Sequence, residues 1–170
     1  MQAVLACGAR SVRLIVDLTS THRYYEPAEL PVGIRHLKLP VVGGAPPAEA
    51  CVDHAVEVIR QLREQYGGYE HAIALVHCTH GLNRTGFFVV SVLVKLDGYT
   101  LTDALAAFAD MRPPGVWRPE YLAELARRFG GDEPEPVPPP EWERTSERYE
   151  EYRQARTQRL LEQWQQQQQQ

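Results

Sequence analysis

The chain has 170 residues, 44% of them hydrophobic and 24% charged, which is enough to bury one core of ordinary size. Its 12 Gly and 13 Pro are close to average use, which excludes a collagen-like chain and wholesale disorder. The net charge of −4 belongs to the C-terminal end, because residues 1–131 carry 13 basic and 13 acidic side chains and residues 132–170 carry 5 and 9. A broad basic surface for nucleic acid is therefore not indicated, so an anionic substrate must be held by a local site.

Targeting signals and a disulfide framework are not evident in this sequence. No apolar run is long enough to cross a bilayer, and the first residues lack the pattern of a secretory signal. Three cysteines, Cys7, Cys51 and Cys78, cannot all pair within one chain. We therefore expect an intracellular protein in a reducing compartment, with no membrane partner.

Short apolar runs along the first 80 residues predict strands. Residues 14–18 and 72–76 have the composition of strands buried on both faces, residues 37–39 suggest a third strand, and residues 1–6 a frayed fourth. Helical signals separate and follow these runs. The predicted helices are 46–66, one that begins after Gly86, 100–112 and 119–130.

This alternation predicts an α/β layer fold, in which helices flank a central, mainly parallel sheet and active groups lie at the carboxyl ends of the strands. We expect residues 1–131 to form the catalytic domain. Residues 132–140 are Pro-rich and predict a stiff linker, and residues 141–170 form a charged, Gln-rich tail suited to recruiting protein partners.

One segment carries most of the chemical information, since it follows a predicted buried strand and enters a helix. It reads His77-Cys78-Thr79-His80-Gly81-Leu82-Asn83-Arg84-Thr85-Gly86. The backbone N–H groups of such a loop converge on a tetrahedral anion, and the helix N-terminus adds its positive end. The same field stabilises a thiolate at Cys78, whose unperturbed pKa of about 8.5 would leave it mostly protonated at neutral pH.

The two residues that end this loop suit phosphoryl chemistry. Arg84 can clamp two phosphoryl oxygens at once, and Thr85 can donate its hydroxyl to the sulfur when the thiolate leaves. A zinc site at His77, Cys78 and His80 is not expected, because adjacent residues of a tight loop point in different directions. We therefore expect neither a metal nor another cofactor.

The spacing from His77-Cys78 to Arg84-Thr85 resembles the signature of the cysteine-dependent phosphatase superfamily. In its residue sequence, the loop is similar to that of RNA 5′-triphosphatases, a group that includes the N-terminal domain of mRNA-capping enzymes and the RNA/RNP complex phosphatase. Residues 17–25 and 112–130 resemble the first loop and the last helix of that branch. The resemblance covers roughly residues 14–142 and implies the cysteine-phosphatase fold, without the element that usually precedes the strand at 14–18.

The resemblance also implies roles for particular residues. Cys78 is implied as the nucleophile and Arg84 as the phosphate binder, with residues 77–83 as the phosphate-binding loop. Arg112, Arg23 and Arg118 lie in stretches that border the pocket in the family and are candidates for contacts to further phosphates. The alternative for each of them is a solvated surface arginine.

Carboxylates are missing where a protein phosphatase usually carries its general acid. The corresponding stretch, residues 39–47, contains no Asp or Glu, and Asp53 and Asp110 are the candidate substitutes. A triphosphate end needs no such acid, because its leaving group is a phosphate whose second ionisation lies near about 6. Asp17 is expected to cap a turn, and Tyr24 and Tyr25 to close the core or to wall the pocket.

Three functions fit this chemistry. The leading hypothesis is a metal-independent polynucleotide 5′-phosphatase that removes the γ-phosphate from triphosphate-ended RNA through a cysteinyl-phosphate, with 5′-triphosphorylated RNA as its partner. The alternatives are a dual-specificity or tyrosine protein phosphatase and a weakly active module that binds phosphorylated ends. A capping role implies the nucleus, and the other roles the nucleus or the cytoplasm. Lys95-Leu-Asp-Gly98 resembles a guanylyltransferase motif, but 170 residues leave no room for that fold.

Overall fold

The computed structural model describes residues 6–7, 10–22, 25–68, 71–131 and 134–144, with the single residues 151, 154 and 158. By its internal contacts the chain divides into two units, residues 1–137 and 138–170. The first unit holds the sheet and the helices α1 to α4, and the second holds α5, Glu141–Arg144. The domain limits set at residues 131 and 140 stay a prediction.

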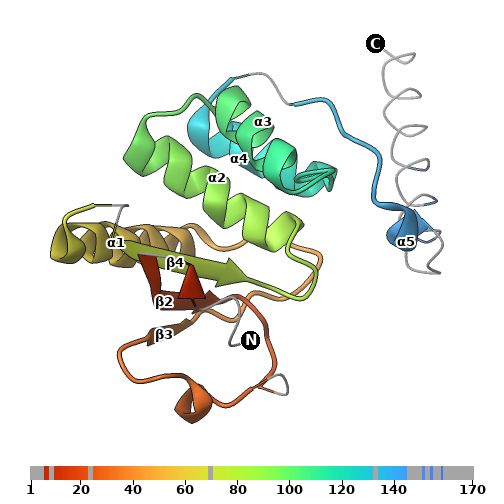
Figure 1. Cartoon of the computed structure of the whole chain (residues 1–170). Helices are drawn as coiled ribbons and strands as arrows, with labels where there is room; N and C mark the ends of the chain where they lie inside the picture. Colours follow the sequence, from red (N-terminus) through yellow and green to blue (C-terminus); the bar gives the residue numbers. More distant parts are fainter. Residues whose placement is uncertain are drawn as a thin grey trace. The chain divides into compact units, whose positions relative to one another are not determined.

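A central strand, β2, organises the sheet (Figure 1). It pairs in parallel with β3 on one side and β4 on the other, and its first residues pair antiparallel with β1. The strands are β1 (Ala6–Cys7), β2 (Arg10–Asp17), β3 (Arg35–Lys38) and β4 (Ala72–His77). The parallel α/β sheet expected from the sequence is thereby confirmed.

The register brings three strand ends to one edge of the sheet. Asp17, the last residue of β2, is opposite Lys38 on β3 and His77 on β4. The chain continues from His77 directly into Cys78. Polar groups that end different strands are therefore neighbours in space, and the candidate nucleophile begins among them.

The strands differ from the expected ranges at their first residues. β2 starts at Arg10 rather than at residue 14, because pairing with β1 and β4 extends it into less apolar sequence. β3 starts at Arg35, two residues before the expected start, for the same reason. Of the strand expected at residues 1–6, residues 1–5 lie outside the described part of the chain, and Ala6 belongs to β1.

The four helices of the first unit follow the predicted order. They are α1 (Glu49–Tyr66), α2 (Asn83–Asp97), α3 (Leu101–Met111) and α4 (Pro119–Phe129). α1 ends at Gly67, whose φ of 72° suits a residue without Cβ. α3 begins as its capping pattern predicts, since the Thr100 side chain accepts a hydrogen bond from the Asp103 N–H.

The start of α2 was predicted too late. The helix begins at Asn83 rather than after Gly86, so Arg84 and Thr85 already belong to its first turn. The physical reason is the short phosphate loop, which turns directly from β4 into the helix. Both side chains are thus carried by helical backbone, which restricts their direction toward the loop.

Helices cover the sheet and enclose one apolar core (Figure 1). α1 and α2 pack against β4, while α3 and α4 pack against α2. Gly86 allows this close approach, since a Cβ there would lie 2.5 Å from Val116 and 2.6 Å from Phe108. The core therefore fixes the first turn of α2, which carries the phosphate loop.

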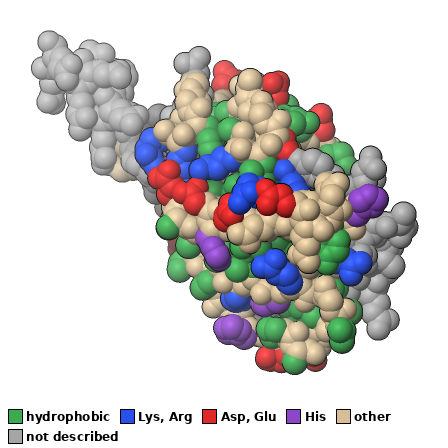
Figure 2. Space-filling model, turned by 90° about the vertical axis from the view of Figure 1, so that its left-hand side faces the viewer, with side chains coloured by type: hydrophobic (Ala, Val, Ile, Leu, Met, Phe, Trp, Pro, Cys, Tyr) green, Lys and Arg blue, Asp and Glu red, His purple; other side chains and the backbone are tan. Residues whose placement is uncertain are grey.

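Charged side chains of both signs are intermingled on the face seen in Figure 2. Within α1, Arg60 pairs with Glu57 at 2.7 Å and also with Glu64. Such pairs neutralise one another locally, so this face carries no broad basic surface. In the described ranges, no helix combines the length and the apolar character needed to cross a membrane.

Candidate active site

Two hydrogen bonds converge on the sulfur of Cys78. The Thr85 hydroxyl donates to Sγ at 3.2 Å, and the Gly81 N–H donates at 3.3 Å. Gly81 has a φ of 69°, a left-handed conformation that favours glycine and turns its N–H toward the sulfur. The loop therefore surrounds the thiol with donors, as its sequence predicts.

These donors change the ionisation of the thiol. Burial by itself raises the pKa of Cys78, because it disfavours the thiolate. Hydrogen bonds from the hydroxyl and N–H of Thr85 and from the N–H groups of His80 and Gly81 outweigh burial, so the net pKa of Cys78 lies below the ordinary value. The geometry thus favours a nucleophilic sulfur.

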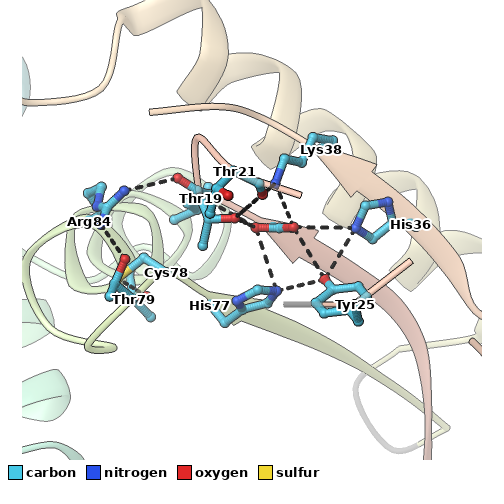
Figure 3. A network of polar contacts seen from close by, with 12 residues as sticks. Thr19, Thr21, Tyr25, His36, Lys38, His77, Cys78, Thr79 and Arg84 are labelled. Atoms are coloured by element: carbon cyan, nitrogen blue, oxygen red, sulfur yellow. Dashed lines mark hydrogen bonds and ion pairs between the residues drawn. The ribbon is translucent and has the colours of Figure 1, made fainter. Parts of the chain in front are cut away.

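Main-chain carbonyls hold the guanidinium of Arg84 beside the loop. Its Nη1 donates to the carbonyls of Val41 at 2.9 Å and Leu18 at 3.3 Å. Its Nη2 donates to the Thr79 hydroxyl at 2.9 Å (Figure 3). These acceptors are neutral, so they orient the side chain without cancelling its positive charge.

The connection between α3 and α4 fastens the other side of the loop. The Asn83 side-chain oxygen accepts hydrogen bonds from the N–H groups of Trp117 and Arg118, both at 3.0 Å. Leu82, just before α2, is 3% exposed and belongs to the protein interior. The loop is therefore tied to α4 at Asn83 and to the core at Leu82.

The three additional arginines predicted from the resemblance have different surroundings. Arg112 is exposed and its Nη2 donates to the carbonyl of His80 at 3.0 Å, so it lies against the phosphate loop. Arg118 stacks 4.9 Å from the ring of Trp117 and pairs with Glu120 at 3.5 Å. Arg23, like Tyr24, lies outside the described residues.

The segment expected to correspond to a general-acid loop does border the site. Its Val41 carbonyl accepts a hydrogen bond from Arg84. Of the two substitute acids, Asp53 is held by Lys95 at 2.6 Å, and Lys95 lies twelve residues into α2, about 18 Å along the axis from the start of the helix. Asp53 is thus wrong as a candidate acid, and exposed Asp110 stays a prediction.

A polar cluster behind the loop was not predicted as a unit, although His77 was predicted in the phosphate-binding loop and Tyr25 as a possible wall of the pocket. It joins the ends of β2, β3 and β4 and consists of Asp17, Thr19, Thr21, Tyr25, His36, Lys38 and His77 (Figure 3). Asp17 caps its turn as predicted, since it accepts the Thr19 N–H at 2.8 Å. Tyr25 is half-buried and polar in its contacts, rather than part of the core. Polar residues at the ends of parallel strands were the available signal.

Metal-ligating side chains do not gather into a candidate metal site in the described ranges. Within them, no group of three or more His, Cys, Asp or Glu side chains has the arrangement of a metal site. Cys51 and Cys78 are free thiols.

Comparison with known proteins identifies relatives of this domain. The family model "Tc-R-P: Polymorphic toxin system, DSP-PTPase phosphatase" matches residues 4–98. The mRNA-capping enzyme of Danio rerio is 39% identical over 133 residues, covering 76% of this chain and 22% of the enzyme. The RNA/RNP complex-1-interacting phosphatase of Rattus norvegicus is 33% identical over 115 residues, covering 68% of this chain and 35% of that protein.

The chain therefore spans about a fifth to a third of the length of these relatives. Solved structures agree on the fold. The crystal structure of human DUSP28 covers 70% of this chain and 77% of its own, with a TM-score of 0.57 and 19% identity. This assignment agrees with the strand-loop-helix around Cys78 and with the order of the sheet. The chain belongs to the DSP-PTPase phosphatases, a family of cysteine-dependent phosphatases.

Proposed function

We propose that this domain is a polynucleotide 5′-phosphatase that removes the γ-phosphate from triphosphate-ended RNA without a metal ion. The observation that carries the proposal is the segment 39–47, which contacts Arg84 through the Val41 carbonyl and contains no carboxylate. Substrates with poor leaving groups need an acid at this position, whereas a diphosphate end departs without one. Similarity to mRNA-capping enzymes and to the RNA/RNP complex-1-interacting phosphatase supports an RNA substrate.

The proposed reaction has two steps. The Cys78 thiolate attacks the γ-phosphorus in line, an S–P bond forms, and the bond to the β-phosphate oxygen breaks with its electron pair on that oxygen. Water then attacks the phosphorus, which releases inorganic phosphate and returns the sulfur as a thiolate. The Thr85 hydroxyl, 3.2 Å from Sγ, stabilises the departing sulfur in this second step.

Arg84 and the loop N–H groups stabilise the charge of the transferring phosphoryl group. The guanidinium is oriented by neutral carbonyls, so its whole charge is available to the substrate. Arg112, resting on the His80 carbonyl, is a further contact for the β-phosphate. If the domain acts in capping, we expect it to work in the nucleus. We also propose that residues 141–170 bind protein partners.

A protein phosphatase is the second candidate, favoured by one relative. A viral protein named "Putative tyrosine-protein phosphatase 1" is 36% identical over 115 residues, covering 67% of this chain and 51% of that protein. The two functions are separated by measuring phosphate release from triphosphate-ended RNA, a phosphotyrosine peptide and ATP, each with EDTA present. We expect RNA to react fastest and EDTA to have no effect. A higher kcat/KM for the peptide, or loss of RNA hydrolysis in EDTA, would contradict the proposal.

A further inference from the structure

Arg128, near the end of α4, joins three parts of the fold. Its Nη2 donates to the carbonyl of Pro47 at 2.6 Å, and its Nε donates to the carboxylate of Glu124 at 2.6 Å. The central carbon of its guanidinium lies 5.0 Å from the ring centroid of Phe87 in α2. The side chain of Arg128 is 7% exposed, so these contacts are made inside the protein. One arginine therefore connects α4, α2 and the end of the segment 39–47.

The segment 39–47 is held at two buried points and is exposed between them. Val41 is 6% exposed, and its carbonyl accepts a hydrogen bond from Arg84 at 2.9 Å. Pro47, at the other end, is fully buried. Residues 42–45 between these two points are exposed. We call residues 42–45 the arch, and its two anchor points are Val41 and Pro47.

Both anchor points are attached to the first turns of α2. Arg84 and Phe87 are three residues apart, so they lie on one face of this helix, about 4.5 Å apart along its axis. Arg84 binds the Val41 carbonyl, and the ring of Phe87 contacts the guanidinium that binds the Pro47 carbonyl. Phe87 itself is completely buried. The helix that carries the phosphate loop therefore sets the positions of both anchor points.

We propose that Arg128 is a positioning residue for Arg84, acting through the segment 39–47. When Arg128 holds Pro47, the Val41 carbonyl stays within reach of Nη1 of Arg84, and the guanidinium keeps its orientation beside the phosphate loop. Without Arg128 the arch gains conformational freedom, because one of its two anchor points is lost. In this arrangement the segment is a fixed wall of the site, and not a lid that closes over substrate. The inference rests on the proposed phosphate-binding role of Arg84, and it is independent of which phosphorylated substrate is bound.

The neighbouring Arg127 provides a matched control. It pairs with the same carboxylate as Arg128, that of Glu124, at 2.7 Å, but its side chain is 62% exposed. Its other ion pair, with exposed Glu49 at 3.9 Å, is weak because both groups are in solvent. Arg127→Gln therefore removes one positive charge and one partner of Glu124, and it leaves the hydrogen bond to Pro47 in place.

The first measurement follows the arch directly, on the full chain and without substrate. Elastase cleaves after small apolar residues, and Val42, which is 72% exposed, offers such a site in the arch. Cleavage requires the arch to detach from the protein, so its rate reports how often this happens. Peptide mass spectrometry should show cleavage after Val42 at least about tenfold faster in Arg128→Gln than in wild type, as for the loss of one charged hydrogen bond. The rate in Arg127→Gln should equal that of wild type.

The second measurement is phosphate release from triphosphate-ended RNA and from p-nitrophenyl phosphate. In Arg128→Gln, kcat should fall about tenfold for both substrates, because a guanidinium that is no longer oriented stabilises the transition state less well. KM should change by less than about threefold, since the N–H groups of the loop still bind the phosphate. In an Arg84→Lys background, Arg128→Gln should lower kcat no further, because the residue through which it acts is already altered.

A core variant separates positioning from general destabilisation. Leu62, near the end of α1, is 2% exposed, so Leu62→Ala should lower the melting temperature while cleavage after Val42 and kcat stay near wild type well below that temperature. If Arg128→Gln likewise changes only the melting temperature, the inference is wrong. Faster cleavage with an unchanged kcat would also overturn it, and so would additive losses of Arg84→Lys and Arg128→Gln. If p-nitrophenyl phosphate shows the expected losses but wild type does not hydrolyse RNA, the positioning role stands and the proposed function fails.

Discussion

The hydroxyl of Thr85 and the sulfur of Cys78 lie 3.2 Å apart at the point where the phosphate loop enters α2. Of the hydrogen bonds that lower the pKa of Cys78 against the opposing effect of burial, this contact has the largest effect. The hydroxyl therefore stabilises the same thiolate that must attack and later leave.

Thr85→Val keeps the shape of the side chain and removes the donor, so it should raise the pKa of Cys78. Because the thiolate is the reactive form, turnover at neutral pH should fall about tenfold and recover in part as the pH increases. Thr85→Ser, which keeps the hydroxyl, should stay within about threefold of wild type. The pH dependence of kcat/KM should be measured for both variants. If its acid limb is unchanged in Thr85→Val, the hydrogen bond from Thr85 to the sulfur of Cys78 does not set the pKa of the thiol.

Arg84→Lys should lower kcat/KM by about a hundredfold or more, on the scale of losing one preorganised transition-state donor. A lysine ammonium cannot reach the Val41 carbonyl, the Thr79 hydroxyl and two phosphoryl oxygens at once. Arg60→Lys, on the exposed surface of α1, is the matched control. A rate near that of wild type for Arg84→Lys would exclude this residue from the site.

Gly86→Ala should destabilise the fold by about 1–3 kcal/mol, the usual cost of overpacking a core. The added Cβ would lie 2.5 Å from Val116 and 2.6 Å from Phe108, both of them in the interior. Urea unfolding measures the loss. The double variant with Gly86→Ala and Val116→Ala should lose less unfolding free energy than the sum of the losses in the two single variants. Strict additivity of the two losses would argue against the clash.

Local features of this chain were predictable because adjacent residues carry them. The apolar run of β4, the loop from His77 to Thr85 and the cap at Thr100 all act over a few residues, and the structure has each of them. The start of α2 was misjudged, since the glycine at 86 reads as a helix boundary but serves close packing.

Contacts between distant segments could not be predicted in the same way. Tyr25 meets His77 across 52 positions, and Asn83 meets Trp117 across 34, each through register and packing that no local pattern encodes. Asp53 was predicted as an acid from its residue type alone, without knowledge of its position. Its carboxyl suits acid catalysis by type, but its partner Lys95 lies far along α2 from the loop.

Asp17 should make stability depend on pH below about 4. Its folded pKa of about 2 lies below the ordinary value of 3.8, so its contribution is present above 3.8 and is lost as the pH falls through about 2. The amount is on the order of 2 kcal/mol. Denaturant unfolding of wild type and Asp17→Asn should differ by this much at pH 7, and the difference should shrink at pH 2. An equal difference at both pH values would contradict the pairing of Asp17 with Lys38.

Deleting residues 146–170 should leave phosphate release and the melting temperature nearly unchanged. Charged and Gln-rich sequence offers too little apolar surface to offset the entropy of ordering. A large loss of activity from this deletion would mean that the tail helps to bind substrate.

The central claim is that Cys78 carries the phosphoryl group from triphosphate-ended RNA. RNA radiolabelled in its γ-phosphate should be mixed with enzyme in EDTA, quenched within the first turnover, and the denatured protein examined for label on the peptide that contains Cys78. The account predicts labelled Cys78 in wild type, and neither label nor phosphate release in Cys78→Ser, although that variant should still bind the RNA end. Phosphate release by Cys78→Ser, or turnover by wild type with no label on this cysteine, would contradict it.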